Sequence, residues 1–316
     1  MTLNKELYRK LYLIRKSEEL ICDHYFDDEM KTPMHMSKGG EAISVGVCHA
    51  LGKGNQFFGT YRSHALYLAI TENTDDFFAE MYGKGTSLQK GKSGSMHLAD
   101  PRAGLMATSA IVGTSIPVAL GAAFALKKKE PKNFAVVFFG DGATDTGVFW
   151  ESLNVACLMN LPILFICEDN DLAVHTPKSA RNGYKSIIDI VSKFNCLTFS
   201  SQSTDAEEIY QLTRDVMKQQ KIGNMPCFIH LKYYRYLEHV GVSPDFHDSY
   251  RSQDEYNEWK SKDPINLQRE KLIQLIGLSE VLKIESELDQ KAQTSLEKAQ
   301  LAPFPPDREI YQDIFA

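Results

Sequence analysis

Short apolar runs alternate with segments of helical periodicity through the middle of the chain. Residues 134–139 (FAVVFF) and 163–167 (ILFIC) are apolar throughout, as is typical of strands buried on both faces of a parallel sheet. Between them, residues 147–160 carry apolar side chains at helical spacing and stop at Leu161-Pro162. Two parallel strands joined by one helix place both strand carboxyl ends at the same edge of a sheet.

The same alternation continues on both sides of this unit. The pattern predicts strands at 57–60, 196–201 and 227–233, and helices at 3–28, 39–51, 109–127, 187–194 and 205–221. Residues 83–108, rich in glycine and lysine, are expected to form a long loop, and 254–263, 265–276 and 279–300 amphipathic helices that cover the sheet. We therefore expect an α/β fold with a doubly wound, mostly parallel sheet flanked by helices and a helical C-terminal region.

Length and composition suit one such domain, spanning 1–316 with a core at about 35–250 and the terminal helices packed on it. The 316 residues are 43% apolar and 24% charged, which is ordinary for a soluble globular enzyme. The net charge of −6 disfavours bulk nucleic-acid binding, and no apolar run is long enough to span a bilayer. The charged N-terminus lacks a signal-peptide core, so a cytoplasmic location is expected. The six cysteines lie singly and are predicted to be reduced, mostly buried thiols.

Polar residues gather where the two central strands end. Gly140-Asp141-Gly142 follows the first strand, and Glu168-Asp169-Asn170-Asp171 follows the second. One carboxylate and one amide oxygen are hard ligands of the kind Mg²⁺ prefers, with phosphate oxygens and water completing the octahedron. The glycines allow close approach of the backbone to phosphate, and the next helix N-terminus favours negative charge. Asp141 and Asn170 are therefore predicted to lie side by side in a magnesium and diphosphate site.

A known motif is resembled by this combination of GDG, the residues around it (GDGATDTGVFWESLNVA) and the later acidic residues followed by Asn170. It is similar to the thiamine-diphosphate-binding motif of the alpha subunit of the 2-oxo acid dehydrogenase and acetoin dehydrogenase family, the decarboxylating first component. The resemblance runs from about His35 to the C-terminal tail. It implies the thiamine-diphosphate-binding fold, with Mg²⁺ held by Asp141, Asn170 and the backbone carbonyl of Leu172. Asp169 replaces the first asparagine of the family motif, which adds a negative charge beside the metal without removing a ligand.

The resemblance also implies the other cofactor contacts. Tyr61 and Arg62 would contact the diphosphate, and Ala110 and Val112 would touch the cofactor, with Val112 or Ile111 supporting its bent shape. The implied set is completed by Gly140, Gly142, Ala143 and His239. Arginine suits phosphate because its donors form a planar fork.

Three histidines are candidates for polarising the substrate carbonyl or transferring a proton, since histidine does either near neutral pH. His239 is the first choice, His97 the second and His64 the third, and the sequence does not separate their roles. His97 lies in the segment KGKSGSMHLADP (residues 90–101), which resembles the family's loop near the cofactor. The family form Gly-His-Ser is replaced by Glu238-His239-Val240, a departure that bears on the substrate.

Two other segments carry weaker implications. Ser249-Tyr250-Arg251 matches the site at which animal members of the family are phosphorylated, and only a role in anchoring its loop is expected here. The small residues of 109–127 fit close helix packing, equally well inside the domain or at a subunit interface.

The family also requires a glutamate that protonates the pyrimidine ring of the cofactor, and in two-chain members it lies on a beta subunit. This chain is too short for a second domain of that kind, so an α2β2 heterotetramer is expected. The implied function is a thiamine-diphosphate-dependent oxidoreductase subunit that decarboxylates a pyruvate-like 2-oxo acid or cleaves acetoin and passes the acyl group to a lipoyl partner. One alternative is a specialised carboligase or decarboxylase without a lipoyl partner. Another is a nucleotide-binding or regulatory protein, although neither GxGxxG after a first strand nor GxxxxGK[ST] is present.

Overall fold

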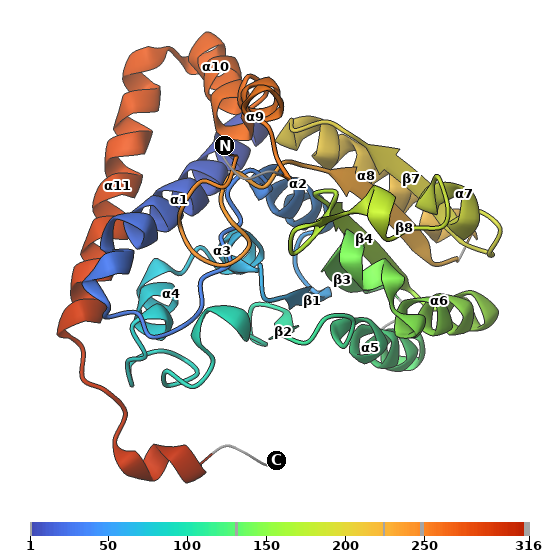
Figure 1. The fold of residues 1–316 in the computed structure, drawn as a ribbon, viewed down its shortest axis with the longest axis horizontal. Coiled ribbons are helices and arrows are strands. Elements are labelled where there is room, and N and C mark those ends of the chain that lie inside the picture. The colour runs from blue at the N-terminus through green and yellow to red at the C-terminus, as the bar shows by residue number, and fades with distance from the viewer. Residues whose placement is uncertain (1, 130–131, 224, 247–249, 313–316) are drawn as a thin grey trace.

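Six parallel strands form the central sheet of the structure, which is a computed structural model and describes residues 2–129, 132–223, 225–246 and 250–312. The strands lie in the order β2-β1-β3-β4-β8-β7 (Figure 1). Their bounds are β1 Gln56–Thr60, β2 Leu105–Ser109, β3 Ala135–Gly140, β4 Ile163–Asp169, β7 Leu197–Ser201 and β8 Cys227–Lys232. Every pairing between neighbours is parallel. The predicted α/β class with a parallel sheet is confirmed.

Helices cover both faces of this sheet. One face packs against α1 (Leu3–His24), α2 (Glu41–Leu51), α3 (His64–Thr71) and α8 (Ala206–Gly223), and the other against α5 (Ser115–Lys129), α6 (Gly147–Met159) and α7 (Ile187–Val191). Successive residues of β3 point into different cores, with Val136 and Phe138 in the first and Val137 and Phe139 in the second. The strand is apolar throughout because both of its faces are buried.

The C-terminal helices α9 (Gln253–Lys260), α10 (Pro264–Ile276) and α11 (Leu278–Leu301) lie outside this first helical layer. We expected them to cover the sheet. Instead α11 runs beside α1 and α4 (Thr74–Met81), and α10 packs on α1, as Figure 1 shows. The apolar stripes of α10 and α11 bury against other helices because α1 already occupies that side of the molecule.

The segment before α5 differs most from the sequence prediction. The helix expected at 109–127 begins at Ser115, and the last part of the expected loop is the edge strand β2. This strand has only two buried residues, so it shows neither an apolar run nor clean alternation. Gly113, at φ +85, makes the turn into the helix, and Pro117 is tolerated in its first turn. Helices α3 and α4, on either side of Asn73, were also missed.

None of the described helices is both long enough and apolar enough to cross a membrane. All six cysteines are free, and all except Cys22 are buried.

Candidate functional site

One cavity at the carboxyl edge of the sheet gathers residues at the ends of β1, β3, β4 and β8. It is lined by Thr60, Tyr61, Arg62, Val112, Gly140, Asp141, Gly142, Ala143, Glu168, Asn170, Leu172, Ala173, Val174, Tyr233 and His239. Every residue expected to contact the cofactor is in this set except Ala110. The edge where parallel strands end is where open α/β sheets bind their ligands.

Asp141, the first expected metal ligand, lies directly after β3 with its side chain buried. Its Oδ2 pairs with Nη2 of Arg181 at 2.5 Å, while its Oδ1 is buried and has no hydrogen-bond partner. Burial, and then the nearby Asp169, raise the pKa of Asp141 to about 7. A cation at Oδ1 would satisfy the orphaned oxygen and favour the ionised carboxylate.

Asn170 and Leu172 are the other two expected metal ligands. The Asn170 amide donates from Nδ2 to the Tyr233 hydroxyl at 3.0 Å, and its Oδ1 accepts from the Leu172 N–H at 3.0 Å. These two bonds fix which end of the amide carries the oxygen. Leu172 begins a small hairpin, β5 (Leu172–Ala173) and β6 (Thr176–Pro177).

The donor set fits magnesium better than a transition metal. Over the described part of the chain, no group of three or more His, Cys, Asp or Glu side chains is placed to hold a metal ion. A site built on Asp141, Asn170 and a Leu172 carbonyl supplies only oxygen and leaves coordination positions for phosphate and water, as Mg²⁺ requires.

Asp169, which departs from the family motif, has its charge compensated by its neighbours. It accepts from His230 Nε2 at 2.5 Å and forms an ion pair with Lys178. Burial opposes its ionisation, but the bonds from His230 and Lys178 outweigh this and hold the pKa of Asp169 below its ordinary value. The extra negative charge expected beside the metal is therefore neutralised within the chain.

Arg62 and Tyr61, at the end of β1, connect the cavity to two other segments. Arg62 donates from Nη1 to the Met36 carbonyl at 2.8 Å and from Nη2 to the His239 carbonyl at 3.0 Å. The Tyr61 ring lies 4.5 Å from the ring of His35. Arg62 thus lines the cavity while bracing the backbone around it.

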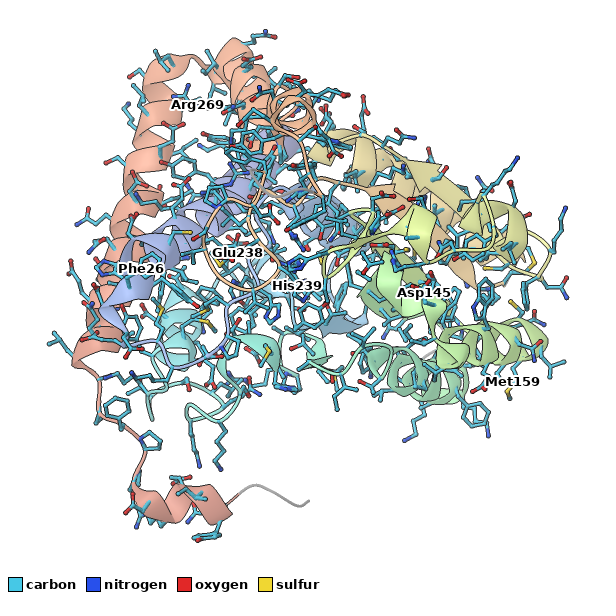
Figure 2. All side chains as sticks on the ribbon, viewed as in Figure 1. Phe26, Asp145, Met159, Glu238, His239 and Arg269 are labelled. Atoms are coloured by element: carbon cyan, nitrogen blue, oxygen red, sulfur yellow. The ribbon has the colours of Figure 1, made fainter. Side chains whose placement is uncertain are left out.

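Of the three candidate histidines, the structure brings only His239 to the cavity, near the middle of the molecule (Figure 2). His64 is fully buried, with Nδ1 3.0 Å from Glu18 Oε1 and Nε2 2.7 Å from Ser95 Oγ. His97 is exposed, and its carbonyl accepts from Gln89 Nε2 at 3.1 Å. Neither His64 nor His97 lines the cavity.

The turn between β2 and α5 holds the other expected contacts. Val112 lines the cavity mouth and is 46% exposed, while Ile111 is 67% exposed. Ala110 lies in the same turn but not on the cavity wall. The exposed apolar side chains at this mouth leave room for another surface to cover them.

The sequence analysis missed His35 as a site residue. Its ring lies 5.3 Å from the His239 ring, and its buried Nδ1 has no hydrogen-bond partner. Burial, and then the nearby Arg62, lower the pKa of His35 to about 3. The only local signal is the Gly39-Gly40 pair that follows it. Gly39 has φ +102, and a Cβ there would lie 2.0 Å from the Tyr234 carbonyl oxygen, so only glycine allows this approach.

Two further cavity residues were not proposed as site residues from the sequence. Glu168 ends in the cavity from β4, and burial raises its pKa to about 8, partly offset by Arg62. Tyr233 follows β8 and supports Asn170. Glu168 stands in the polar cluster that the sequence placed at the end of the second central strand, and Tyr233 directly follows β8, so both obey the strand-end rule that predicted Asp141.

The loop after β8 is anchored as expected for Tyr250 and Arg251. Both contact Asp245, Arg251 through Nη1 at 2.5 Å and Tyr250 through its hydroxyl. Ser249 lies outside the described residues.

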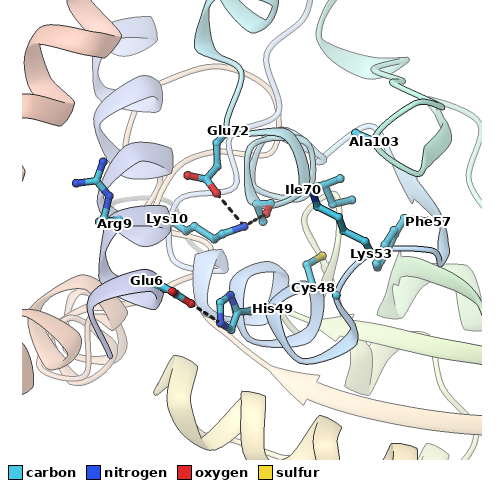
Figure 3. Close-up of a pocket in the computed structure, with 12 residues that line it drawn as sticks. Glu6, Arg9, Lys10, Cys48, His49, Lys53, Phe57, Ile70, Glu72 and Ala103 are labelled. Atoms are coloured by element: carbon cyan, nitrogen blue, oxygen red, sulfur yellow. Dashed lines mark hydrogen bonds and ion pairs between the residues drawn. The ribbon is translucent and has the colours of Figure 1, made fainter. Parts of the chain in front are cut away.

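A second cavity lies at the opposite edge, near the amino ends of β1 and β2 (Figure 3). Two charged pairs form within it, Lys10 with Glu72 at 3.2 Å and His49 with Glu6 at 3.2 Å, and Arg9 pairs with Glu287 outside it. None of the expected site residues lies there, so the cavity at the carboxyl edge is the candidate site.

The fold is a parallel α/β protein, and the cavity at its strand ends presents oxygen donors and glycine backbone of the kinds that fit a metal ion and a phosphate group. The model of the family described as dehydrogenase E1 component matches residues 9–307, and the chain belongs to this family.

Curated relatives align over 98% of the chain. The alpha subunit of acetoin:2,6-dichlorophenolindophenol oxidoreductase from Bacillus subtilis (strain 168) is 31% identical over 310 residues, with 92% of that protein covered. The alpha subunit of pyruvate dehydrogenase E1 component from Zymomonas mobilis is 29% identical over 312 residues, with 87% covered. The alpha subunit of acetoin:2,6-dichlorophenolindophenol oxidoreductase from Cupriavidus necator is 28% identical over 312 residues, with 93% of that protein covered.

Proposed function

We propose that the chain is the alpha subunit of a thiamine-diphosphate-dependent dehydrogenase that acts on a pyruvate-like 2-oxo acid or on acetoin. The observation that carries this proposal is the orphaned Oδ1 of Asp141, which shares one cavity with Asn170, Leu172 and Arg62. Relatives named for acetoin and for pyruvate support the two substrate classes equally.

Each part of the site has a proposed role. Asp141, the Asn170 amide oxygen and the Leu172 carbonyl would hold Mg²⁺, which in turn would hold the diphosphate. Gly140 and Gly142 would let the backbone approach the diphosphate. When bound, thiamine diphosphate supplies a thiazolium carbon that adds to a carbonyl and accepts the electrons released as the carbon–carbon bond breaks.

We further propose a beta subunit, in an α2β2 assembly, as the source of the glutamate that activates the pyrimidine ring. Exposed apolar side chains on this chain support a partner close to the site. Ile111 and Val112 stand at the cavity mouth, and Val118 and Phe124 are exposed on α5. The opposite side of α5, including Ala119 and Ala123, packs inside the chain. These two alanines thus serve an internal contact, while Gly121 and Ala125 are exposed, and a subunit interface on that side remains a prediction.

The three histidines receive different proposed roles. His239 is the histidine proposed to face the cofactor. The contacts of His64 with Glu18 and Ser95 favour support of the 83–97 loop over chemistry. His97 does not line the cavity, and its role in proton transfer stays a prediction.

Reduction of a dye acceptor by the reconstituted complex tests this function. Pyruvate, branched-chain 2-oxo acids, acetoin and 2-oxoglutarate would be compared with the chain alone and with its beta subunit. We expect turnover of at least one of these substrates only when both chains, the cofactor and Mg²⁺ are present. Normal turnover by the chain alone, or no turnover of any of them by the complex, would contradict the proposal.

A specialised decarboxylase or carboligase without a lipoyl partner is the second candidate. Val240, beside His239, is 42% exposed where the family commonly has serine, and Glu238 turns back to accept from the Ser243 N–H at 2.9 Å. Transfer of the acyl group to a free lipoyl domain separates the two, because the second candidate predicts product formation without any such transfer.

A further inference from the structure

We infer that Arg62 and Arg235 together hold His239 as the neutral tautomer with its proton on Nε2, so that this histidine is a hydrogen-bond donor in the site and not a base. The tautomer itself does not depend on the proposed function. Only the identity of the group that accepts from the Nε2–H, the cofactor or the substrate, rests on it. It assigns a role that the sequence left open between carbonyl polarisation and proton transfer.

The tautomer follows from what lies around Nδ1 of the ring. Nη2 of Arg62 and Nη1 of Arg235 each lie 3.4 Å from His239 Nδ1. A guanidinium has only N–H donors and keeps its charge, so Nδ1 must accept with its lone pair. A neutral imidazole with an accepting Nδ1 carries its proton on Nε2. A proton on Nδ1 would instead point at two sets of N–H groups.

Neither arginine is free to turn away from the ring. Arg235 is 1% exposed, donates from Nε to the Leu237 carbonyl at 2.8 Å and pairs through Nη2 with Asp245 Oδ2 at 2.8 Å. Arg62 is held by the carbonyls of Met36 and of His239 itself. Arg235 is therefore a positioning residue for His239.

Arg235 also reaches the metal-side hairpin. Its Nη1 lies 3.4 Å from the carbonyl of Val174, which lines the same cavity. Val174 has φ +56, a conformation that is strained for a β-branched residue. One buried guanidinium thus fixes both the candidate histidine and the strained turn that follows the Leu172 ligand.

The other groups around His239 do not oppose this assignment. Burial, then Arg62 and Arg235, and more weakly His175, lower the pKa of His239 to about 4. His35 and Tyr61 face the ring edge-on, at 5.3 and 5.7 Å between ring centres. The carboxyl groups that line the same cavity, Asp141 and Glu168, make no recorded hydrogen bond to the ring within the described residues.

The consequence is chemical. With Nδ1 occupied by two arginines and Nε2 protonated, the ring has no free lone pair with which to remove a proton. Its remaining polar atom is the Nε2–H, suited to a phosphate oxygen, a carbonyl oxygen or an oxyanion. Proton removal in this site must then come from another group, on this chain or on its partner.

Nitrogen NMR of the full chain labelled with ¹⁵N-histidine tests the tautomer without cofactor, substrate or activity. The His239 signals, assigned by their loss in His239→Gln, should show an unprotonated Nδ1 and a protonated Nε2 that persist from pH 8 to pH 6. Arg235→Gln should raise the pKa of His239 toward that of an ordinary histidine, whereas Arg235→Lys, which keeps the charge, should raise it less. A protonated Nδ1 in the unmodified chain would overturn the inference, even if the chain binds thiamine diphosphate as proposed.

Substitutions at His239 give a second readout in the active complex. The amide nitrogen of glutamine falls near Nε2 of histidine, and that of asparagine near Nδ1. His239→Gln should therefore keep turnover within about tenfold, while His239→Asn and His239→Ala should lose about 100-fold or more, the usual effect of deleting one such donor. Equal loss in all three variants would contradict the donor role. Because the NMR arm needs no turnover, failure of the proposed function and failure of this inference are distinguishable.

Discussion

The two oxygens of Asp141 meet different surroundings, and this difference defines the site at the scale of single residues. One oxygen is paired with Arg181, and the other is buried without a partner. Asp141 and Asn170 could be predicted from sequence because each directly follows a recognisable strand. His35 could not, because its place depends on a bridge to Gly241, far along the chain. Contacts between such distant segments leave no local pattern.

His35 also provides a prediction at this scale. Its folded pKa, about 3, lies below that of an ordinary histidine, so the unfolded chain takes up a proton first as the pH falls. The stability contributed by neutral His35 is fully present above about pH 6.5 and is lost as the pH falls toward 3. His35→Asn removes this loss, so relative to the unmodified chain the variant should gain about 1.5 kcal/mol between pH 6.5 and pH 5.

Urea unfolding of both proteins at the two pH values measures this gain. His24→Asn is a matched control, since His24 is the last residue of α1 and its partly exposed side chain lies beside Asp27. A stability difference between the His35→Asn and unmodified chains that does not change with pH would contradict the account of a buried, neutral His35.

At the scale of elements, a buried carboxylate organises the glycine- and lysine-rich loop that carries His97. Glu80, in α4, is 2% exposed. Its Oε1 accepts from the backbone N–H groups of Ser93 and Gly94, at 2.7 and 2.9 Å, and its Oε2 from the Gly91 N–H at 3.1 Å and from Ser87 Oγ at 2.5 Å. The sequence predicted the loop from composition. It did not predict this anchor, because α4 itself was missed.

Glu80→Ala should therefore loosen the loop, since it leaves several backbone donors unpaired at once. Trypsin cleaves after lysine, and Lys92 lies inside the segment that Glu80 holds. We expect cleavage at Lys92 to be at least tenfold faster in Glu80→Ala than in the unmodified chain, with Glu80→Gln between the two. Mass spectrometry of a digestion time course would show this. Glu29→Ala, at an exposed neighbouring carboxylate, should not change the rate.

The C-terminal segment supports the same loop from outside. Lys84 lies 4.0 Å above the Phe304 ring, and the Gly85 N–H donates to the Pro303 carbonyl at 2.9 Å. If Glu80→Ala leaves cleavage unchanged, this outer contact rather than the carboxylate holds the loop, and Phe304→Ala should then accelerate cleavage instead.

At the scale of the whole molecule, one buried ion network joins the two ends of the chain. Arg15 in α1 pairs with Glu41 at the start of α2 at 2.6 Å and with Asp263, the N-cap of α10, at 3.1 Å. The apolar alternation along the chain predicted a parallel sheet with helices on both faces. It did not predict the strand order, or that the last helices stack on α1. Both depend on tertiary packing between helices and strands that are distant in the sequence.

Arg15→Ala should cost about 3–5 kcal/mol in the free energy of unfolding, because it leaves the buried Glu41 without its ion pair and leaves Asp263 with Lys260 as its remaining cation. Lys16→Ala is the matched control. Its pair with Asp289, at 3.6 Å, is partly exposed and should contribute less than about 1 kcal/mol. Denaturant unfolding measures both variants. A loss below about 1 kcal/mol for Arg15→Ala would show that the network does not hold the terminal helices.

The central claim is that Asp141 and Asn170 hold the metal and diphosphate end of a thiamine cofactor. Calorimetric titration of thiamine diphosphate into the complex of this chain with its beta subunit, with and without Mg²⁺, tests it most directly. We predict heat of binding that requires Mg²⁺ and that is lost in Asp141→Ala and in Asn170→Ala while both variants stay folded. Absence of heat with Mg²⁺ present, or unchanged binding in both variants, would contradict the account.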